Sequence, residues 1–179
     1  KKMKKIITSI FVLSLLFVSC KEKAKEEKVS NAENTTEKIA SAIYNVNSET
    51  STLNWKGFKP TGTHNGTVTL KEGSFEVKDD KLVSGKFVFD MNTITVLDIP
   101  AEEEGNAKLT GHLKSGDFFD VENNEFATFQ ISGESSNTLI KGDLTIKGIT
   151  KSIEFPVTMS STEEGIKLTG ATFQIDRTD

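Results

Sequence analysis

Residues 67–91 read TVTLKEGSFEVKDDKLVSGKFVFDM, and this stretch indicates the fold class. Apolar side chains alternate with polar ones along Thr67–Val77 and again along Leu82–Met91, as they do in strands that bury one face. Asp79 and Asp80, followed by a lysine, separate the two runs and predict a tight turn. We therefore expect an antiparallel hairpin whose second strand buries Phe87, Phe89 and Met91.

Comparable short runs occur on both sides of this hairpin. They predict further strands at residues 51–59, 126–132, 139–146, 153–159 and 166–175. The triplet His64-Asn65-Gly66 is interpreted as another turn, with Gly66 suited to left-handed backbone. Short strands at such regular spacing are typical of a β-sandwich or an up-and-down barrel, so we predict an all-β domain.

One segment, Pro100–Gly116, lacks the alternation. Pro100 suits the first turn of a helix, and the glutamates that follow it suit the positive end of the helix dipole. Leu109 and Leu113 are four residues apart, so one face of a helix could dock against the sheet. The segment predicts one short helical excursion between strands.

The N-terminal 19 residues resemble an export signal. Lysines at positions 1, 2, 4 and 5 precede the apolar stretch Ile6–Val18, which is too short for a convincing membrane span and fits a secretory signal. Ser19-Cys20 follows directly and resembles a bacterial lipobox. Cys20 is the only cysteine of the chain, so we predict cleavage before it and acylation of its thiol. The alternative is an ordinary signal peptide with an incidental cysteine.

The following residues, 21–42, are charged or small and lack apolar periodicity, which predicts a flexible tether. We therefore divide the chain into a lipoprotein signal peptide at 1–19, a lipidated cysteine and tether at 20–42, and a β domain at 43–179. Acyl chains on Cys20 would make the membrane a partner. The expected location is the bacterial cell envelope, in the periplasm or at the outer-membrane surface.

The charge balance argues against nucleic acid as a partner. The chain has 22 Lys and Arg against 26 Asp and Glu, and four of the lysines lie in the first five residues. Without the signal peptide the excess of acid grows, whereas phosphate binding requires basic stripes. A single cysteine also excludes an internal disulfide.

Motifs for catalysis and metal binding are scarce. The two histidines, His64 and His112, have no His or Cys neighbour at ligand spacing, so we expect no metal site. The sequence contains no Gly-x-Ser-x-Gly elbow and no phosphate-binding glycine loop. We therefore expect neither catalytic residues nor an enzymatic cofactor.

Several blocks resemble signatures of the YceI-like family, in the family's order, over residues 44–179. His112–Val121 resembles the run L-K-S-x-D-F-F-D-V, and Gly142–Lys151 resembles G-x-L-T-I-x-G-V-T-K. Tyr44–Ser48 resembles the opening Y-x-V-D, with Asn for Asp, and Phe173–Arg177 resembles the late F-x-I-x-R strand. The family usually continues past this block to a closing strand, which we expect to be missing here because the sequence ends at Asp179.

The resemblance implies an extended antiparallel, lipocalin-like β-barrel that holds a long isoprenoid chain, such as a polyprenyl quinone or polyprenyl phosphate. Alternate residues of a barrel strand point inward, and an apolar inner face can gain affinity from the area it removes from water. The candidate ligand-binding residues are accordingly Trp55, Phe87, Phe89, Met91, Phe129, Ile131, Leu144, Ile146, Phe155, Val157, Phe173 and Ile175.

An inward apolar residue can also belong to a packed core, and the pattern does not separate the two roles. For Trp55 the structural role is favoured, although its ring could stack on a head group. The leading hypothesis is thus an anchored isoprenoid-binding protein that makes and breaks no bonds. The alternative is a packed barrel that serves as a surface adaptor for an unknown protein partner. An enzyme acting on bound lipid would need a titratable group beside the lumen, and the sequence nominates none.

Overall fold

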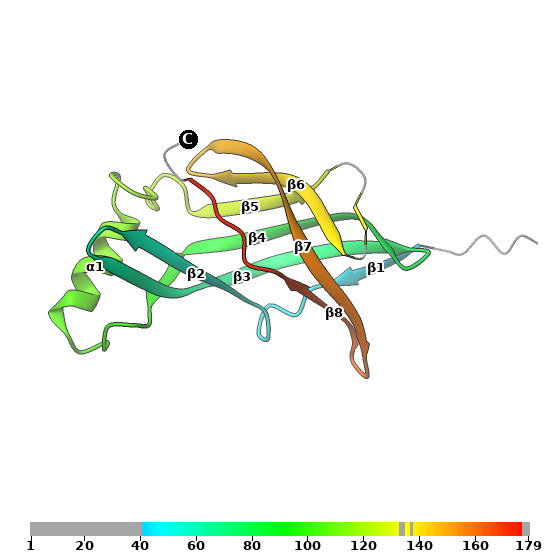
Figure 1. Ribbon diagram of the computed structural model, residues 1–179, viewed down its shortest axis with the longest axis horizontal. Coiled ribbons are helices and arrows are strands. Elements are labelled where there is room, and N and C mark those ends of the chain that lie inside the picture. Colours follow the sequence, from blue (N-terminus) through cyan, green and yellow to red (C-terminus); the bar gives the residue numbers. More distant parts are fainter. Residues whose placement is uncertain (1–40, 133–134, 137, 177–179) are drawn as a thin grey trace, which may run out of the picture. The chain divides into compact units, whose positions relative to one another are not determined.

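The computed structural model describes residues 41–132, 135–136 and 138–176 (Figure 1). The predicted signal peptide, Cys20 and nearly all of the tether lie outside these residues. The described part contains, in chain order, β1 (Ala42–Asn45), β2 (Thr52–Lys59), β3 (Gly62–Lys78), β4 (Lys81–Val96), α1 (Glu104–Lys114), β5 (Phe126–Ile131), β6 (Leu139–Ile146), β7 (Ile149–Thr162) and β8 (Gly165–Gly170).

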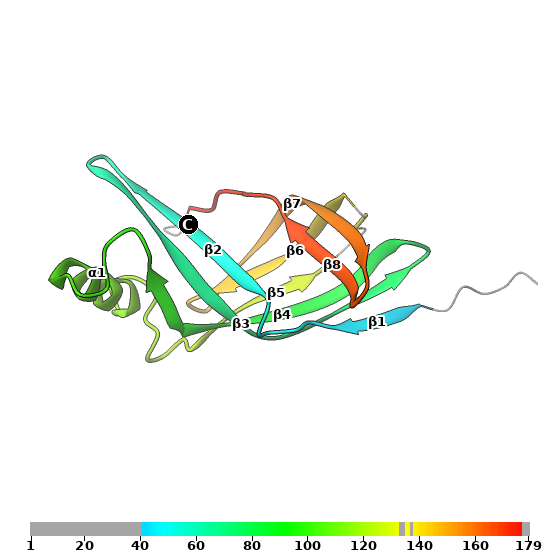
Figure 2. The same cartoon turned by 90° about the horizontal axis from the view of Figure 1, so that it is seen from below.

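Every strand pairing in the described residues is antiparallel, in the order β1-β3-β4-β5-β6-β7-β8. β2 pairs with β3 on the same edge as β1 but farther toward the start of β3. The sheet curls so that β7 and β8 lie over the face formed by β3, β4 and β5 (Figure 2). The result is a nearly closed barrel with one short helix, which confirms the predicted fold class.

The β3–β4 hairpin forms as the alternation predicts. Asp79 and Asp80 have φ angles of 51° and 57°, the left-handed conformation that a tight hairpin turn needs. Val77 pairs with Leu82 next to this turn, and Leu82 has no exposed surface at all. Bulges interrupt the register at several points, which bends this long hairpin and helps the sheet to curl.

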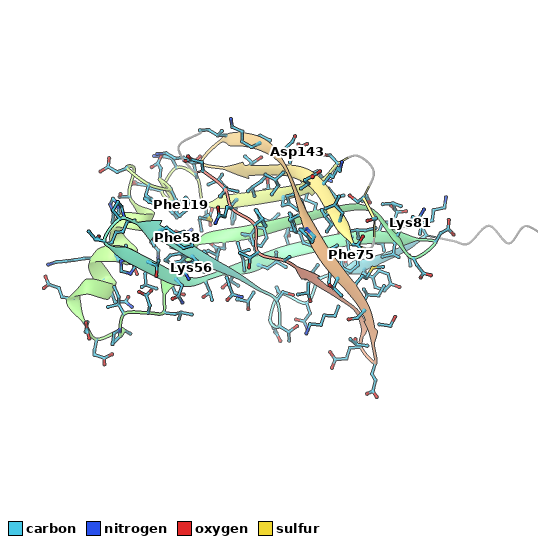
Figure 3. All side chains as sticks on the ribbon, viewed as in Figure 1. Lys56, Phe58, Phe75, Lys81, Phe119 and Asp143 are labelled. Atoms are coloured by element: carbon cyan, nitrogen blue, oxygen red, sulfur yellow. The ribbon has the colours of Figure 1, made fainter. Side chains whose placement is uncertain are left out.

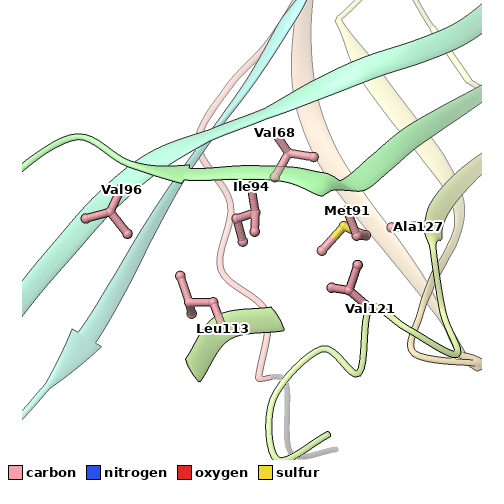
Figure 4. Packing of buried hydrophobic residues seen from close by; sticks show 7 residues of the cluster. All are labelled: Val68, Met91, Ile94, Val96, Leu113, Val121 and Ala127. Atoms are coloured by element: carbon pink, nitrogen blue, oxygen red, sulfur yellow. The ribbon is translucent and has the colours of Figure 1, made fainter. Parts of the chain in front are cut away.

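The helix is where the sequence predicts one, but it begins later. The amide of Glu103 donates to the carbonyl of Pro100 at 3.0 Å, so these residues form a turn that precedes the helix. Leu113 is buried and Leu109 is half-buried, and both face the sheet as their spacing predicts. Figure 4 shows Leu113 pointing from the helix toward Ile94 of β4, with Val121 and Met91 beside them in the same cluster.

The predicted turn at His64-Asn65-Gly66 is wrong, because these residues continue β3 and the chain reverses before them, between β2 and β3. Gly66 serves close packing instead. A Cβ atom there would lie 1.7 Å from the carbonyl oxygen of Thr95 and 2.7 Å from the ring of Trp55.

The predicted last strand, 166–175, is also too long, because β8 ends at Gly170. The amide of Ala171 still donates to the carbonyl of Pro156 at 2.8 Å. Pro156 itself has no N–H to donate, so the ladder between β7 and β8 loses a bond at this point. Phe173 and Ile175 consequently lie in a non-strand segment and are 37% and 44% exposed.

Part of the β2–β3 hairpin extends beyond the third strand. β4 pairs with β3 only from Gly66 onward, so residues 57–65, which we call the ribbon, consist of two strands. Asp98 fastens the ribbon: its Oδ1 accepts the amide of Asn65 at 2.8 Å, and its Oδ2 lies 2.8 Å from Nδ1 of His64. The Asn65 amide and the His64 ring hold the pKa of Asp98 below its usual 3.8.

The close approach at Gly66 gives a stability prediction. Gly66→Ala should destabilise the domain by more than about 2 kcal/mol, because the clash is with the backbone of β4 and β3 must move to relieve it. Gly111→Ala is the matched control, since its Cβ meets nothing within 4 Å. That change should stabilise α1 by roughly 0.5–1 kcal/mol. The free energy of unfolding of both variants, measured in urea, checks this prediction. Equal changes in that free energy for the two variants would contradict it.

Asp98 gives a pH prediction. Its pKa is lower in the folded state than in the unfolded chain, so its stabilising effect is complete above pH 3.8 and is lost as the pH falls through the folded pKa. Asp98→Asn should therefore speed amide exchange of residues 57–65 at neutral pH, and the difference from the unmodified protein should shrink in acid. Amide hydrogen exchange of both proteins, measured at the same pH values, checks this prediction. If the two exchange rates differ by the same factor at neutral and at acidic pH, the charge of Asp98 is not responsible.

Candidate functional site

The inner face of the barrel carries two adjoining apolar clusters. The helix-end cluster consists of the buried residues Val68, Met91, Ile94, Val96, Leu113, Val121 and Ala127. The turn-end cluster consists of the buried residues Phe75, Val77, Leu82, Phe129, Ile131, Ile140 and Val157. Phe89 packs against both clusters and joins them into one continuous apolar surface.

Ten of the twelve candidate residues belong to this surface. Trp55, Met91 and Ile146 lie at the helix-end cluster, and Phe89 lies between the two clusters. The turn-end cluster holds the remaining six, which are Phe87, Phe129, Ile131, Leu144, Phe155 and Val157. The structure therefore brings together side chains from β2, β4, β5, β6 and β7.

Phe173 and Ile175 differ from the other ten because they follow the last described strand. Phe173 nevertheless stacks on Phe155, with ring centroids 4.5 Å apart and planes inclined by 16°. Ile175 is not part of either cluster. Of this pair, then, Phe173 continues the apolar surface and Ile175 does not.

Aromatic rings form a row across the inside of the barrel. The centroids of Phe87 and Phe129 are 6.3 Å apart, and those of Phe129 and Phe155 are 5.4 Å apart. Phe173 extends the row by its stack on Phe155. These separations lie in the range of favourable ring contacts, so the row is held together by its own members.

Burial divides the surface into a floor and a wall. The floor residues Met91, Phe129, Ile131 and Val157 are buried and belong to the packed core. The wall residues are only half-buried, namely Trp55, Phe87, Phe89, Leu144, Ile146 and Phe155. The wall therefore keeps apolar area that a ligand could cover, whereas the floor supports it from below.

Trp55 is held by the protein itself. Its indole Nε1 donates to the carbonyl oxygen of Thr95 at 3.1 Å, and its ring lies against Gly66. A buried indole N–H usually has such a partner. The polar end of Trp55 is thus engaged by the backbone, which agrees with the structural role that we favoured for it.

Two aromatic residues after the helix anchor its loop. Phe118 and Phe119 pack against the helix-end cluster. Their two rings meet edge to face, with centroids 4.7 Å apart. His112 approaches Phe118 edge-on at 5.6 Å. Lys147 reaches the same loop, where its Nζ donates to the carbonyl of Gly116 at 2.6 Å. Together these contacts hold the loop and α1 against one end of the barrel.

Charged side chains of the described residues all keep some exposure to solvent. No polar or charged residue in the described part of the chain is fully buried. Besides Asp98, Glu76 has a lowered pKa, because the hydroxyls of Ser41 and Ser84 donate to its half-buried carboxylate. Among the described residues, no three His, Cys, Asp or Glu side chains gather in a way that could hold a metal ion. The side chains that gather on this surface are apolar.

A small polar hollow of about 310 Å³ lies on β6 and β7, and the sequence analysis missed it. Its lining consists of Ser132, Lys141, Gly142, Ser152, Ile153 and Glu154. Lys141 and Glu154 pair across it, with Nζ 3.3 Å from Oε2. None of the candidate ligand-binding residues lines this hollow. Its polar residues come from β6, β7 and the residue after β5, and no motif in the sequence connects them.

The described residues contain no helix with the length and apolar character needed to cross a bilayer. Membrane association through Cys20 and residues 1–19 concerns a part of the chain outside the described residues, so it stays a prediction. Arg177, part of the late sequence block, is likewise outside them.

Proteins of Staphylococcus aureus are similar to this chain in sequence. The UPF0312 protein SA2479 of strain N315 and the UPF0312 protein SAV2687 of strain Mu50 are each 34% identical to the chain over 110 residues. The match covers 58% of this chain and 63% of each relative. The chain thus spans less than two thirds of the length of these relatives.

Solved structures are more distant. *Burkholderia cenocepacia* BcnA has 17% identity and a TM-score of 0.39, with 73% of this chain and 74% of that chain covered. A mutant CJ YCEI protein with a monobromobimane guest has 14% identity and a TM-score of 0.38, with 84% and 71% covered.

The profile of the YceI-like domain matches residues 44–179. The matched region contains every described strand except the first two residues of β1, together with α1 and the apolar surface inside the barrel. By this match over most of its length, the chain belongs to the YceI-like domain family.

Proposed function

We propose that this domain binds a long isoprenoid chain, such as that of a polyprenyl quinone or polyprenyl phosphate, along the apolar surface inside its barrel. The observation that carries the proposal is the continuous surface from the helix-end cluster to the turn-end cluster, with half-buried side chains along its wall. Membership of the YceI-like family supports the same conclusion.

The dimensions of the surface suit a long ligand. Val68 and Val77 mark its two ends on β3 and are nine residues apart, which corresponds to roughly 30 Å of extended strand. A flexible hydrocarbon chain could follow such a surface without needing polar partners. Each square ångström of apolar area removed from water would contribute about 25 cal/mol.

A packed barrel that binds a protein partner is the second candidate function. The direct contacts among Phe87, Phe129 and Phe155 favour it, because rings that already touch one another can serve as core. The half-buried state of Phe87 and Phe155 favours the lipid proposal instead. The two functions differ in whether a molecule covers the wall residues.

We also propose that Cys20 is acylated and anchors the protein in the bacterial cell envelope. This proposal stands on the sequence alone, through the apolar stretch that precedes the single cysteine. Cys20→Ser should shift the protein from the membrane fraction to the soluble fraction of the envelope, or leave it unprocessed, and should remove the mass of the acyl chains. Intact-mass analysis of purified protein checks this; a cysteine that carries no lipid would refute the anchor.

The cargo prediction is tested by native mass spectrometry of the protein purified without detergent exchange. A discrete added mass that disappears on organic extraction is expected, and the extracted lipid should re-bind. Phe155→Ala should weaken re-binding roughly ten- to hundredfold, because it removes a large apolar contact from the wall.

Phe126→Ala is the matched control. Phe126 is also a half-buried phenylalanine of the sheet, but it faces outward, where Lys71 Nζ lies 3.9 Å from its ring centroid. The Phe126→Ala variant should re-bind the lipid as well as the unmodified protein does. A bare protein mass that no added polyprenyl compound changes would reject the lipid proposal and favour the packed barrel.

A further inference from the structure

An exposed apolar patch lies on the outer side of the ribbon and of the residues next to it. Phe58 of the ribbon is 65% exposed, and Leu97, the residue after β4, is 62% exposed. The register places Phe58 opposite Thr63 and Lys56 opposite Asn65, while the amide of Leu97 donates to the carbonyl of Asn65 at 2.9 Å. Phe58, Lys56 and Leu97 therefore lie on one face of neighbouring strands.

This patch is not part of the barrel surface. Successive residues of β2 point to opposite faces of the strand. Trp55 packs against the helix-end cluster, so Lys56 and Phe58 lie on the face that points away from it. Because β4 does not pair beyond Gly66, no third strand supports the tip of the ribbon. Figure 3 shows Lys56 and Phe58 near the α1 end of the domain and Lys81 at the other end of the β3–β4 hairpin.

One positive charge lies beside the exposed ring, and a second lies at the tip of the ribbon. Lys56 Nζ is 5.4 Å from the centroid of Phe58. Lys59 is the last residue of β2, next to Pro60, and belongs to the other alternate set of β2 residues. Among the described residues, neither lysine forms an ion pair. The acid bound to the ribbon, Asp98, is already engaged by His64 and by the Asn65 amide. Both ammonium groups can therefore meet an outside anion.

The size and chemistry of the patch favour a lipid surface over a protein as its partner. A specific protein interface needs about 800 Å² on each side, which two exposed apolar side chains do not supply. Aromatic side chains beside lysines are instead typical of segments that lie in the interface of a bilayer. Lysines could also protect the free edge of β2 from pairing, but that role does not require an exposed phenylalanine.

We propose that the ribbon docks on an anionic lipid surface, with Phe58 at the acyl boundary and Lys56 and Lys59 among the lipid phosphates. Asp98 keeps the ribbon in place by bonding two consecutive residues of β3. The same ribbon begins next to Trp55, which packs in the helix-end cluster, so docking brings that end of the barrel to the membrane. A route for cargo at this end rests on the proposed function; the docking itself does not.

Lysine footprinting of the full chain tests the proposal. The protein is acetylated in solution, with phosphatidylcholine vesicles, and with vesicles rich in phosphatidylglycerol. Reactivity of Lys56 and Lys59 should fall by about fivefold or more on the anionic vesicles, because each lysine gains that order of attraction near such a surface. Lys81, at the turn between β3 and β4, should keep its reactivity and serves as the internal control.

Matched variants separate docking from other causes. Phe58→Ser should restore the reactivity of Lys56 and Lys59, whereas Val83→Ser, which alters an exposed apolar residue beside Lys81, should leave the protection intact. Far-ultraviolet circular dichroism verifies that both variants fold. Equal reactivity with and without anionic vesicles would overturn the proposal, and protection seen only in intact cells would replace the membrane by a protein partner.

The outcome is independent of cargo binding. Native mass spectrometry of Phe58→Ser should show the same bound mass as the unmodified protein, since Phe58 faces away from the barrel surface. Protection of the ribbon in a protein that carries no lipid would refute the proposed function and leave the docking site standing. A bound lipid together with an unprotected ribbon would overturn the docking site and leave the proposed function standing.

Discussion

Burial of one face of the β3–β4 hairpin constrains the rest of the structure. Its strands span Gly62–Lys78 and Lys81–Val96, and every second side chain of this long hairpin needs a covering partner. The sheet meets that need by curling, because Leu82 of β4 and Ile140 of β6 become its least exposed large side chains although β5 separates their strands. Bulges in the hairpin make the bend possible.

Curling also creates the difference between floor and wall. Phe129 on β5 is buried, whereas Trp55 on β2 and Phe155 on β7 keep part of their surface exposed. A fully closed and filled barrel would have only floor. The half-buried wall is therefore the feature from which an apolar ligand would gain its affinity.

The two ends of the barrel differ in character. At one end α1 and the loop after it, with Phe118 and Phe119, cover the helix-end cluster. At the same end the ribbon extends past its neighbouring strand, and Asp98 supports it through hydrogen bonds rather than through apolar packing. The exposed Phe58 and Lys56 thus face away from the barrel surface, so the proposed membrane docking and the proposed cargo binding would use different surfaces.

Local patterns in the sequence determined the strands, the Asp79-Asp80 turn, the position of the helix and the inward parity of ten candidate residues, because periodicity and turn chemistry act between near neighbours. Only the tertiary structure decided which of those residues are floor and which are wall, since burial depends on strands far apart in the chain. The same reason explains the errors. Gly66 resembles a turn residue in the sequence, and only the fold shows that the Thr95 carbonyl lies against it. The strand predicted to run through Phe173 ends at Gly170, because the next residue, Ala171, lies opposite Pro156.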